Sequence, residues 1–264
     1  MQTINYQGIQ IVQDSQFKKE DALVIEAALQ ININHEAYTV VMRTPENDLE
    51  LVRGLLYAED IYKKDLPFGF EVVEEKESFE SIVNISIPRE QLGKGYLNKR
   101  TLLSVSSCGI CGKQALKDLV VSGEKINLPY ALAAQNIQAM FEVLQEHQKA
   151  FKNSGGSHAA AIFNRKNKLL SIKEDIGRHN AVDKVIGDLL LKNQLGDASF
   201  LLVSGRVSYE IVSKAFIAKI PIIVAVSACS SLAVDFAKEF GICLIGFARG
   251  EKMTLYANPN YLTK

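Results

Sequence analysis

The stretch FLLVSGRVSYEIVSKAFIAKIPIIVAVSACSSLAVDFAKEFGICLIGF, residues 200–247, decides the fold, because apolar runs of strand length alternate in it with amphipathic helical segments. Strands are expected at 200–203, 222–226 and 243–247, and helices at 208–218 and 232–240. Such alternation is typical of parallel strands joined through helices. In sheets of this kind the functional loops usually follow the strand ends.

The same alternation begins earlier in the chain. Apolar residues at helical spacing predict one helix from Ile137 to Phe151, which Gly155-Gly156 ends. Two strands are expected next, at 158–163 and 169–172, and then a helix that buries Val182 to Leu190. The order α-β-β-α-β-α-β-α-β predicts a largely parallel sheet covered by helices on both faces, which is a three-layer α/β domain.

The first hundred residues have a different pattern, since short segments rich in β-branched residues dominate there. Strands are expected at 22–25, 29–33, 38–42, 69–73 and 82–87. One helix interrupts them; it begins near Asn47 or Asp48 and carries Leu49, Val52, Leu55 and Leu56 on one face. We therefore predict a strand-rich N-terminal part over residues 1–125 and an α/β domain over residues 126–264.

Composition narrows the function classes. The 264 residues are 47% hydrophobic and hold 30 basic and 30 acidic side chains. A net charge of zero argues against a nucleic-acid binder and leaves room for a small anion pocket. No run reaches the ~18 apolar residues of a membrane span, and the start lacks the features of a signal peptide. We expect a cytoplasmic protein that binds neither nucleic acid nor membrane.

The loop Ser106-Ser107-Cys108-Gly109-Ile110-Cys111-Gly112 is the first candidate for chemistry. Two cysteines three residues apart can share one small site, and in a reducing compartment such a pair is more often catalytic or metal-binding than structural. A thiol attacks as its thiolate, which a helix start or nearby cations stabilise. A helix is expected at 113–121, and Arg100 and Lys113 are close in sequence. The loop therefore has both a helix start and nearby cations to stabilise a thiolate. Cys108 and Cys111 are therefore the candidate catalytic residues.

Two other interpretations of the pair are weaker. A structural zinc site needs four ligands, and the remaining Cys229 and Cys243 stand apart beside strands that look buried, where they are most simply small apolar residues. We therefore expect no bound metal. A thioredoxin-like dithiol should follow the first strand of a small βαβ unit, which this loop does not.

A second candidate is an anion pocket. Arg178 and His179 stand at a helix start, where free N–H groups bind phosphate, although a helix capped by its own Asp175 or Asn180 would explain the same polar residues. Arg206 and Arg249 each stand beside a glycine after a buried strand. A guanidinium gives phosphate two charge-assisted hydrogen bonds. Three arginines in such positions favour a pocket for a phosphorylated ligand over a set of solvated turns.

The motifs S-S-C-G-x-C-G at 106–112, G-G-x-H-A-A at 155–160, E-D-I-G-R-H-N-A-x-D-K at 174–184, S-G-R-x-S at 204–208, S-L-A-V at 231–234 and G-F-A-R-G at 246–250 resemble the FdhD/NarQ family in order and spacing. The resemblance covers nearly the whole chain. One departure is Ala58-Glu59-Asp60, where the family pattern has a glycine after the glutamate.

The resemblance implies a sulfurtransferase that accepts persulfide sulfur from a cysteine desulfurase. It passes this sulfur to the molybdenum or tungsten of a bis(molybdopterin guanine dinucleotide) cofactor destined for formate dehydrogenase. The persulfide-bearing cysteine corresponds to Cys108, and the cofactor-binding segment to Phe247-Ala248-Arg249-Gly250-Glu251-Lys252. Cys111 takes a relay, resolving or supporting role, among which the sequence does not choose. Two guanine nucleotides require two pockets, which either one chain or a symmetric dimer supplies, and the family resemblance favours the homodimer.

The family's fold is similar to that of cytidine deaminases with a smaller N-terminal part added, which agrees with the predicted order of elements. Deaminase chemistry needs an H-x-E segment and P-C-x-x-C to hold zinc. Here His158 is followed by Ala159-Ala160, and no proline precedes Cys108, so we expect no deaminase activity. Two other functions stay open: a cofactor-binding chaperone that transfers no sulfur, and a dithiol oxidoreductase.

Overall fold

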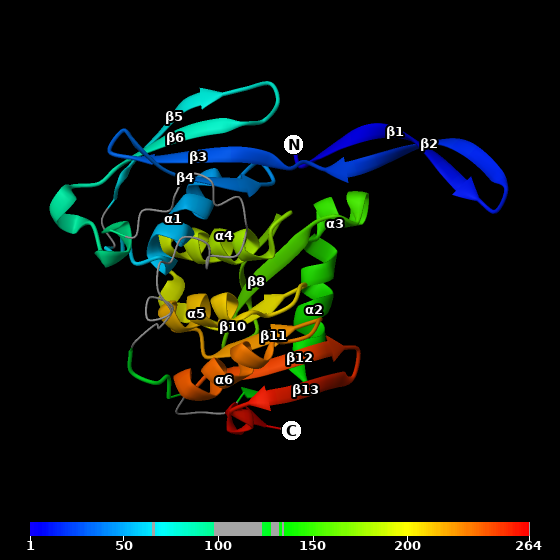
Figure 1. Cartoon of the computed structure of the whole chain (residues 1–264). Coiled ribbons are helices and arrows are strands. Elements are labelled where there is room, and N and C mark those ends of the chain that lie inside the picture. Colours follow the sequence, from blue (N-terminus) through cyan, green and yellow to red (C-terminus); the bar gives the residue numbers. More distant parts are fainter. Residues whose placement is uncertain (65–66, 98–122, 128–131, 134, 264) are drawn as a thin grey trace.

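The computed structural model describes residues 1–64, 67–97, 123–127, 132–133 and 135–263 (Figure 1). Its centre is a six-stranded sheet in the order β13-β12-β11-β10-β8-β9. The strands are β8 (His158–Asn164), β9 (Leu169–Asp175), β10 (Ala198–Val203), β11 (Ile222–Ala225), β12 (Cys243–Arg249) and β13 (Lys252–Ala257).

The prediction of a largely parallel sheet is wrong. The pairs β10/β11 and β11/β12 are parallel, whereas β8/β9, β8/β10 and β12/β13 are antiparallel. Short turns join β8 to β9 and β12 to β13, and a short turn can connect only antiparallel neighbours. The sheet is therefore mixed, with its three parallel strands in the middle.

Helices cover both faces of this sheet, which confirms the three layers (Figure 1). One face packs against α4 (Arg178–Leu191), α5 (Tyr209–Ile217) and α6 (Ser231–Phe240), and the other against α2 (Asn136–His147). In β8 the alternation is direct, since Ala160 and Ile162 lie in the first core and Ala161 and Phe163 in the second. No helix in the described ranges is long and apolar enough to cross a bilayer.

The single helix predicted from Ile137 to Phe151 is instead two helices. After α2 the backbone breaks at Gln148, and α3 (Lys149–Ser154) begins in a new direction. The carboxylate of Glu174 accepts the N–H groups of Ala150 and Phe151 at 2.8 Å each, so it caps the start of α3. The start of α3 is thus stabilised by a residue of β9, and the helical spacing of apolar residues does not show this contact.

The N-terminal part has its own four-stranded sheet in the order β4-β3-β6-β5. Its strands are β3 (Ala27–Ile33), β4 (Glu36–Arg43), β5 (Gly69–Glu75) and β6 (Ser81–Ser86), and α1 (Asp48–Ala58) packs on it. These elements confirm the predicted strands 29–33, 38–42, 69–73 and 82–87 and the predicted helix. The small pair β7 (Leu132–Ala133) and β14 (Leu262–Thr263) joins a distant segment to the end of the chain.

The helices α1 and α4 join the two parts through a close contact. A Cβ built on Gly54 would lie 2.0 Å from the carbonyl oxygen of Asp183, and one on Gly187 would lie 1.9 Å from that of Glu50. Only glycine permits such an approach of two helix backbones. The division of the chain at residue 125 remains a prediction, but the two sheets share this helix pair.

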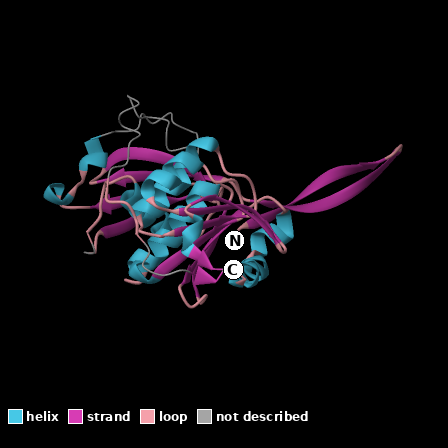
Figure 2. Cartoon of the chain, turned by 90° about the horizontal axis from the view of Figure 1, so that it is seen from below, coloured by secondary structure: helices cyan, strands magenta, loops and turns pink. Residues whose placement is uncertain are grey.

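A two-stranded ribbon, β1 (Thr3–Val12) and β2 (Ser15–Val24), projects from the body (Figures 1 and 2). The sequence predicted only a strand at 22–25. Most of the ribbon is exposed on both faces. In β1, Ile4 and Tyr6, and then Ile9 and Ile11, alternate with polar residues, so the sequence holds a strand pattern there that the prediction did not use.

The departure from the family pattern at Asp60 affects a backbone turn. Asp60, which follows the C-cap residue Glu59 of α1, has a φ of 57°. This left-handed conformation favours glycine. The glycine expected from the family resemblance would suit this turn, and in this chain Asp60 adopts it.

Candidate functional site

The loops that follow the central strands gather at one edge of the six-stranded sheet. The carboxyl ends of β10, β11 and β12 lie there, together with the start of β8, which runs antiparallel to β10. The loops after β10 and β11 are tied to each other, because Val207 N–H donates to Ala228 O at 3.0 Å and Ser230 N–H donates to Val207 O at 3.0 Å. The structure therefore brings the loops after β10 and β11 together at this edge.

His158 and Arg178 meet at Gly205. The start of β8 is fixed to this loop, since Ala159 N–H donates to Ser204 Oγ at 2.9 Å and Ser204 N–H donates to Ala159 O at 3.0 Å. A Cβ on Gly205 would lie 3.1 Å from His158 Nδ1 and 3.5 Å from Arg178 Cβ. The missing side chain therefore lets an imidazole and an arginine approach the same loop.

The charges here favour an anion. Burial lowers the pKa of His158, Arg178 lowers it further, Asp175 acts in the opposite direction, and Arg206 again lowers it. The imidazole is therefore neutral at pH 7. Within the described part of the chain, the Nε of Arg178 is buried without a hydrogen-bond partner. A buried guanidinium nitrogen in this state is costly unless a ligand accepts from it.

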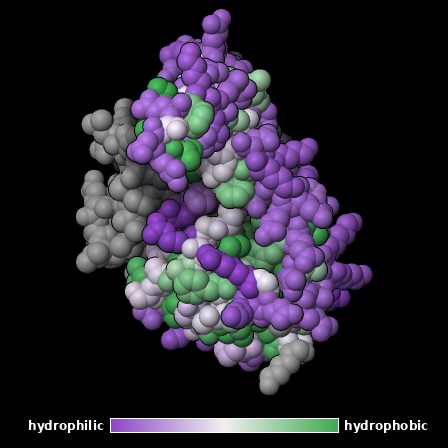
Figure 3. Space-filling view, turned by 90° about the vertical axis from the view of Figure 1, so that its right-hand side faces the viewer, coloured by the Kyte–Doolittle hydropathy of each residue, from purple (hydrophilic) through white to green (hydrophobic). Residues whose placement is uncertain are grey.

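A cavity of about 510 Å³ opens on the α2 side of this edge. Its lining includes Leu144, Gln148, Phe151, His158, Ser204 and Val226. The volume lies in the range of small-ligand sites, and the mixture of apolar walls with a few polar groups is typical of them. Figure 3 looks onto this side of the molecule, where hydrophobic residues lie among hydrophilic ones below the ribbon.

The segment Phe247 to Lys252 contacts residues at and beside the cavity. It forms the end of β12, the turn at Gly250 and Glu251, and the start of β13. Arg249 Nε donates to Val226 O at 3.0 Å, and Phe247 N–H donates to Ser227 O at 3.1 Å. Phe247 is 45% exposed, whereas Ala248 is buried. Val226 lines the cavity, so the segment lies next to it.

His179 lies behind the surface of the site. Its side chain is 4% exposed; Nε2 lies 3.0 Å from Ser208 Oγ, and Nδ1 lies 3.4 Å from Glu210 Oε2. Ser208 ends the motif S-G-R-x-S at 204–208 but was given no role of its own there, and Glu210, two residues later, was not singled out. An imidazole flanked by a hydroxyl and a carboxylate can move a proton between them.

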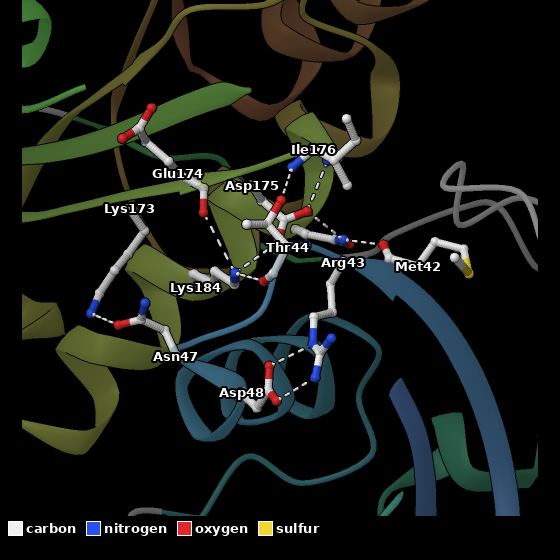
Figure 4. A network of polar contacts seen from close by, with 12 residues as sticks. Met42, Arg43, Thr44, Asn47, Asp48, Lys173, Glu174, Asp175, Ile176 and Lys184 are labelled. Atoms are coloured by element: carbon white, nitrogen blue, oxygen red, sulfur yellow. Dashed lines mark hydrogen bonds and ion pairs between the residues drawn. The ribbon is translucent and has the colours of Figure 1, made fainter. Parts of the chain in front are cut away.

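Most other polar residues of the segment 174–184 hold the fold together, as Figure 4 shows for several of them. Asp175 accepts from Gly177 N–H at 2.8 Å and from Asn180 Nδ2 at 2.9 Å. The N-cap residue of α4 is Gly177 and no side chain caps the helix, so the alternative of a start capped by Asp175 or Asn180 is wrong. Lys184 Nζ lies 2.7 Å from Asp175 Oδ2, and both side chains are fully buried. The segment 174–184 therefore contains residues that make structural contacts and also Arg178, whose Nε makes no hydrogen bond among the described residues.

The candidate catalytic cysteines Cys108 and Cys111 lie outside the described residues, as does the helix expected at 113–121. The other two can be placed. Cys243 is fully buried, and burial raises its pKa to about 12; Cys229 is partly buried, and burial raises its pKa to about 11. Both thiols stay protonated at neutral pH and are poor nucleophiles. The described residues contain no cluster of three or more metal-ligating side chains.

Comparison with known proteins gives a consistent result. The model of the FdhD/NarQ family matches residues 24–263. The chain is 38% identical to the sulfur carrier protein FdhD of Nocardia farcinica over 265 residues, which covers 96% of this chain and 92% of that protein. It is 39% identical to the sulfur carrier protein FdhD of Sulfolobus acidocaldarius over 241 residues, which covers 91% and 90%.

Among solved structures, the chain is similar to a formate dehydrogenase accessory protein from Desulfotalea psychrophila. The TM-score is 0.77 at 21% sequence identity, and all of both chains is covered. At this identity the likeness concerns the fold, and it extends over the mixed sheet, its helices and the N-terminal part alike.

Proposed function

The chain belongs to the FdhD/NarQ family, and we propose that it is a sulfur carrier for formate dehydrogenase that holds the transferred sulfur as a persulfide on Cys108. Sulfur carriage follows from the family, because curated relatives that match over nine tenths of the chain have that name. The persulfide, its donor and its acceptor are our proposal.

The first step is a thiol exchange. The Cys108 thiolate attacks the outer sulfur of a persulfide on a cysteine desulfurase, a new S–S bond forms, and the donor cysteine leaves as its thiolate. No oxidant is needed, because the outer sulfur keeps its oxidation level. The burial of Cys243 and the partial burial of Cys229, with their raised pKa values, support a division in which the pair Cys108 and Cys111 supplies the reactive thiols.

The second substrate is the bis(molybdopterin guanine dinucleotide) cofactor, to whose metal the sulfur passes. The unpartnered Nε of Arg178 is the single observation that carries this part of the proposal. A phosphate of the guanine dinucleotide would accept from it, while Arg206 and Arg249 border the same edge. The adjoining cavity of about 510 Å³ has apolar walls suited to a purine ring.

Each chain offers one such edge among its described residues, whereas the cofactor has two guanine nucleotides. A symmetric homodimer would bring two equal pockets to one cofactor, and we include it in the proposal.

We propose the cytoplasm as the location, where free thiols persist. The cytidine deaminase-like character of residues 126–264 belongs to the proposal too, and the three layers support it.

Intact-protein mass spectrometry tests the persulfide. The protein is incubated with an active cysteine desulfurase and cysteine, and wild type is compared with Cys108→Ala, Cys111→Ala and, as a matched control, Cys229→Ala. We expect a reducible one-sulfur adduct in wild type and in Cys229→Ala, and its loss in Cys108→Ala. If wild type stays unmodified, the persulfide mechanism is wrong and a cofactor-binding chaperone becomes the better description.

A further inference from the structure

Two serines occupy equivalent positions in successive strand-loop-helix units of the central sheet. Ser208 is the N-cap residue of α5 after β10, and Ser230 is the N-cap residue of α6 after β11. Ser230 behaves as expected, because its Oγ accepts from Ala233 N–H at 3.2 Å. Ser208 makes no such capping bond, and its Oγ lies 3.0 Å from His179 Nε2. The Ser208 side chain therefore does not cap α5 and contacts His179 instead.

The imidazole is held on its other side. His179 Nδ1 lies 3.4 Å from Glu210 Oε2, and the two side chains are 4% and 15% exposed. A carboxylate at Nδ1 favours the tautomer with its proton there, which leaves Nε2 as the acceptor of the serine O–H. Hydroxyl, imidazole and carboxylate therefore follow one another in the order that activates a nucleophilic serine.

The carboxylate is anchored from the interior. Lys214 Nζ lies 3.7 Å from Glu210 Oε1 and 2.7 Å from Asp183 Oδ1, and the Lys214 and Asp183 side chains are each 4% exposed. A buried lysine between two carboxylates limits the positions that Glu210 can take, and so fixes the ring that Glu210 orients. Ser208 itself is only partly buried and stands at the positive end of the α5 dipole, where developing negative charge is stabilised.

We propose that Ser208 is a nucleophile, with His179 as its base and Glu210 as the group that orients His179, and that it hydrolyses an ester or thioester with an anionic acyl group. The anionic class follows from Arg206, two residues before Ser208, and Arg178, next to His179. This activity does not depend on the proposed sulfur transfer.

The step balances without any further reactant. The Ser208 O–H bond breaks, the proton passes to His179 Nε2, and Oγ bonds to the acyl carbon, whose carbonyl electron pair moves to oxygen. As that oxyanion collapses, the leaving alcohol or thiol takes the proton from His179. Water then releases the acyl group by the same route and restores the Ser208 hydroxyl.

Labelling with a fluorophosphonate tests the nucleophile, since such a reagent forms a stable bond to an activated serine with loss of fluoride. Intact mass and peptide mapping should show one adduct, on Ser208, in wild type and in Ser230→Ala, and none in Ser208→Ala. His179→Gln and Glu210→Gln should each react at least tenfold more slowly. Thermal unfolding of every variant separates this loss from misfolding.

Turnover of 4-nitrophenyl succinate, an ester with an anionic acyl group, tests the activity. The rate in wild type and in Ser230→Ala should exceed that in Ser208→Ala at least tenfold. A folded wild-type protein that gives no adduct on Ser208, or an ester turnover equal in wild type and Ser208→Ala, would overturn the proposal. The contact between Ser208 and His179 would then be a structural hydrogen bond.

Discussion

Lys184 and Arg178 stand six residues apart on α4, and their surroundings are opposite. Lys184 is fully buried, lies 2.7 Å from Asp175 Oδ2, and donates to Thr44 O at 2.8 Å. Arg178 is partly buried, and its Nε has no hydrogen-bond partner within the described residues. The inner residues of this short polar segment therefore join the N-terminal part to the central sheet, whereas Arg178 is the residue that we propose binds a ligand.

Contacts other than those of Lys184 also join the N-terminal part to the central sheet. Asp175 also accepts from Thr44 N–H at 3.2 Å, Asn180 Nδ2 donates to Met42 O at 2.8 Å, and Ile176 N–H donates to Thr44 Oγ1 at 3.0 Å (Figure 4). These contacts link β4 and the residue after it to the end of β9 and the start of α4. If the comparison is correct, changes at the inner residues should reduce stability, and changes at Arg178 should reduce binding.

The largest effect is expected for Lys184→Met. This change leaves the Asp175 carboxylate buried without its cation, which costs about 3–5 kcal/mol of unfolding free energy. Denaturant unfolding followed by circular dichroism measures it. Lys192→Met is the matched control, because Lys192 forms an i,i+4 pair with Asp188 from the same helix but is 50% exposed. The control should change stability by no more than about 0.5 kcal/mol. Equal losses in both variants would contradict a fastening role for Lys184.

The next largest effect is expected for Gly54→Ala at the α1–α4 contact. The new Cβ would lie 2.0 Å from the Asp183 carbonyl oxygen, so the two helices must separate. Overpacking of this kind outweighs the better helix propensity of alanine, and we expect a net loss of about 2 kcal/mol. Gly196→Ala serves as the control, since nothing lies within 4 Å of its Cβ position. An unchanged melting temperature for Gly54→Ala would mean that the helix pair is looser than the structure shows.

The sequence reveals these regions to different degrees, for physical reasons. Strands β10, β11 and β12 are buried on both faces and give continuous apolar runs, so their positions are readable, as are the loops that follow them. The directions of β8, β9, β12 and β13 depend on short turns, which the spacing of apolar residues does not show. The apolar residues of the ribbon strand β1 alternate with polar ones but are exposed, so their pattern marks no buried face. The fastening contacts join residues as far apart as Thr44 and Lys184, separated by 140 positions. Local periodicity therefore could not distinguish Lys184 from Arg178.

Arg178→Ala should give the opposite result to Lys184→Met. The change removes a guanidinium that lacks a partner at Nε, so the unfolding free energy should stay within about 0.5 kcal/mol of wild type. The affinity for guanosine diphosphate, used as a probe of the cofactor's nucleotide, should fall about tenfold, or ~1.4 kcal/mol. Isothermal titration calorimetry measures it, with Lys166→Ala, an exposed residue on the β8–β9 turn, as the control. A stability loss without an affinity loss would assign Arg178 to the fastening instead.

The smallest effect concerns the pH dependence of that affinity. Burial and the two arginines hold the pKa of His158 below its usual value in the free protein. A bound phosphate would offset the arginine charges and raise this pKa, so binding would take up a proton. Affinity should therefore rise several-fold as the pH falls from 8 to 6, beyond the change that phosphate protonation itself produces. His158→Gln isolates this contribution, because the ligand's own titration remains while the imidazole is gone. Identical pH profiles for wild type and His158→Gln would show that His158 does not sense the ligand, and would restrict the anion site to the arginines.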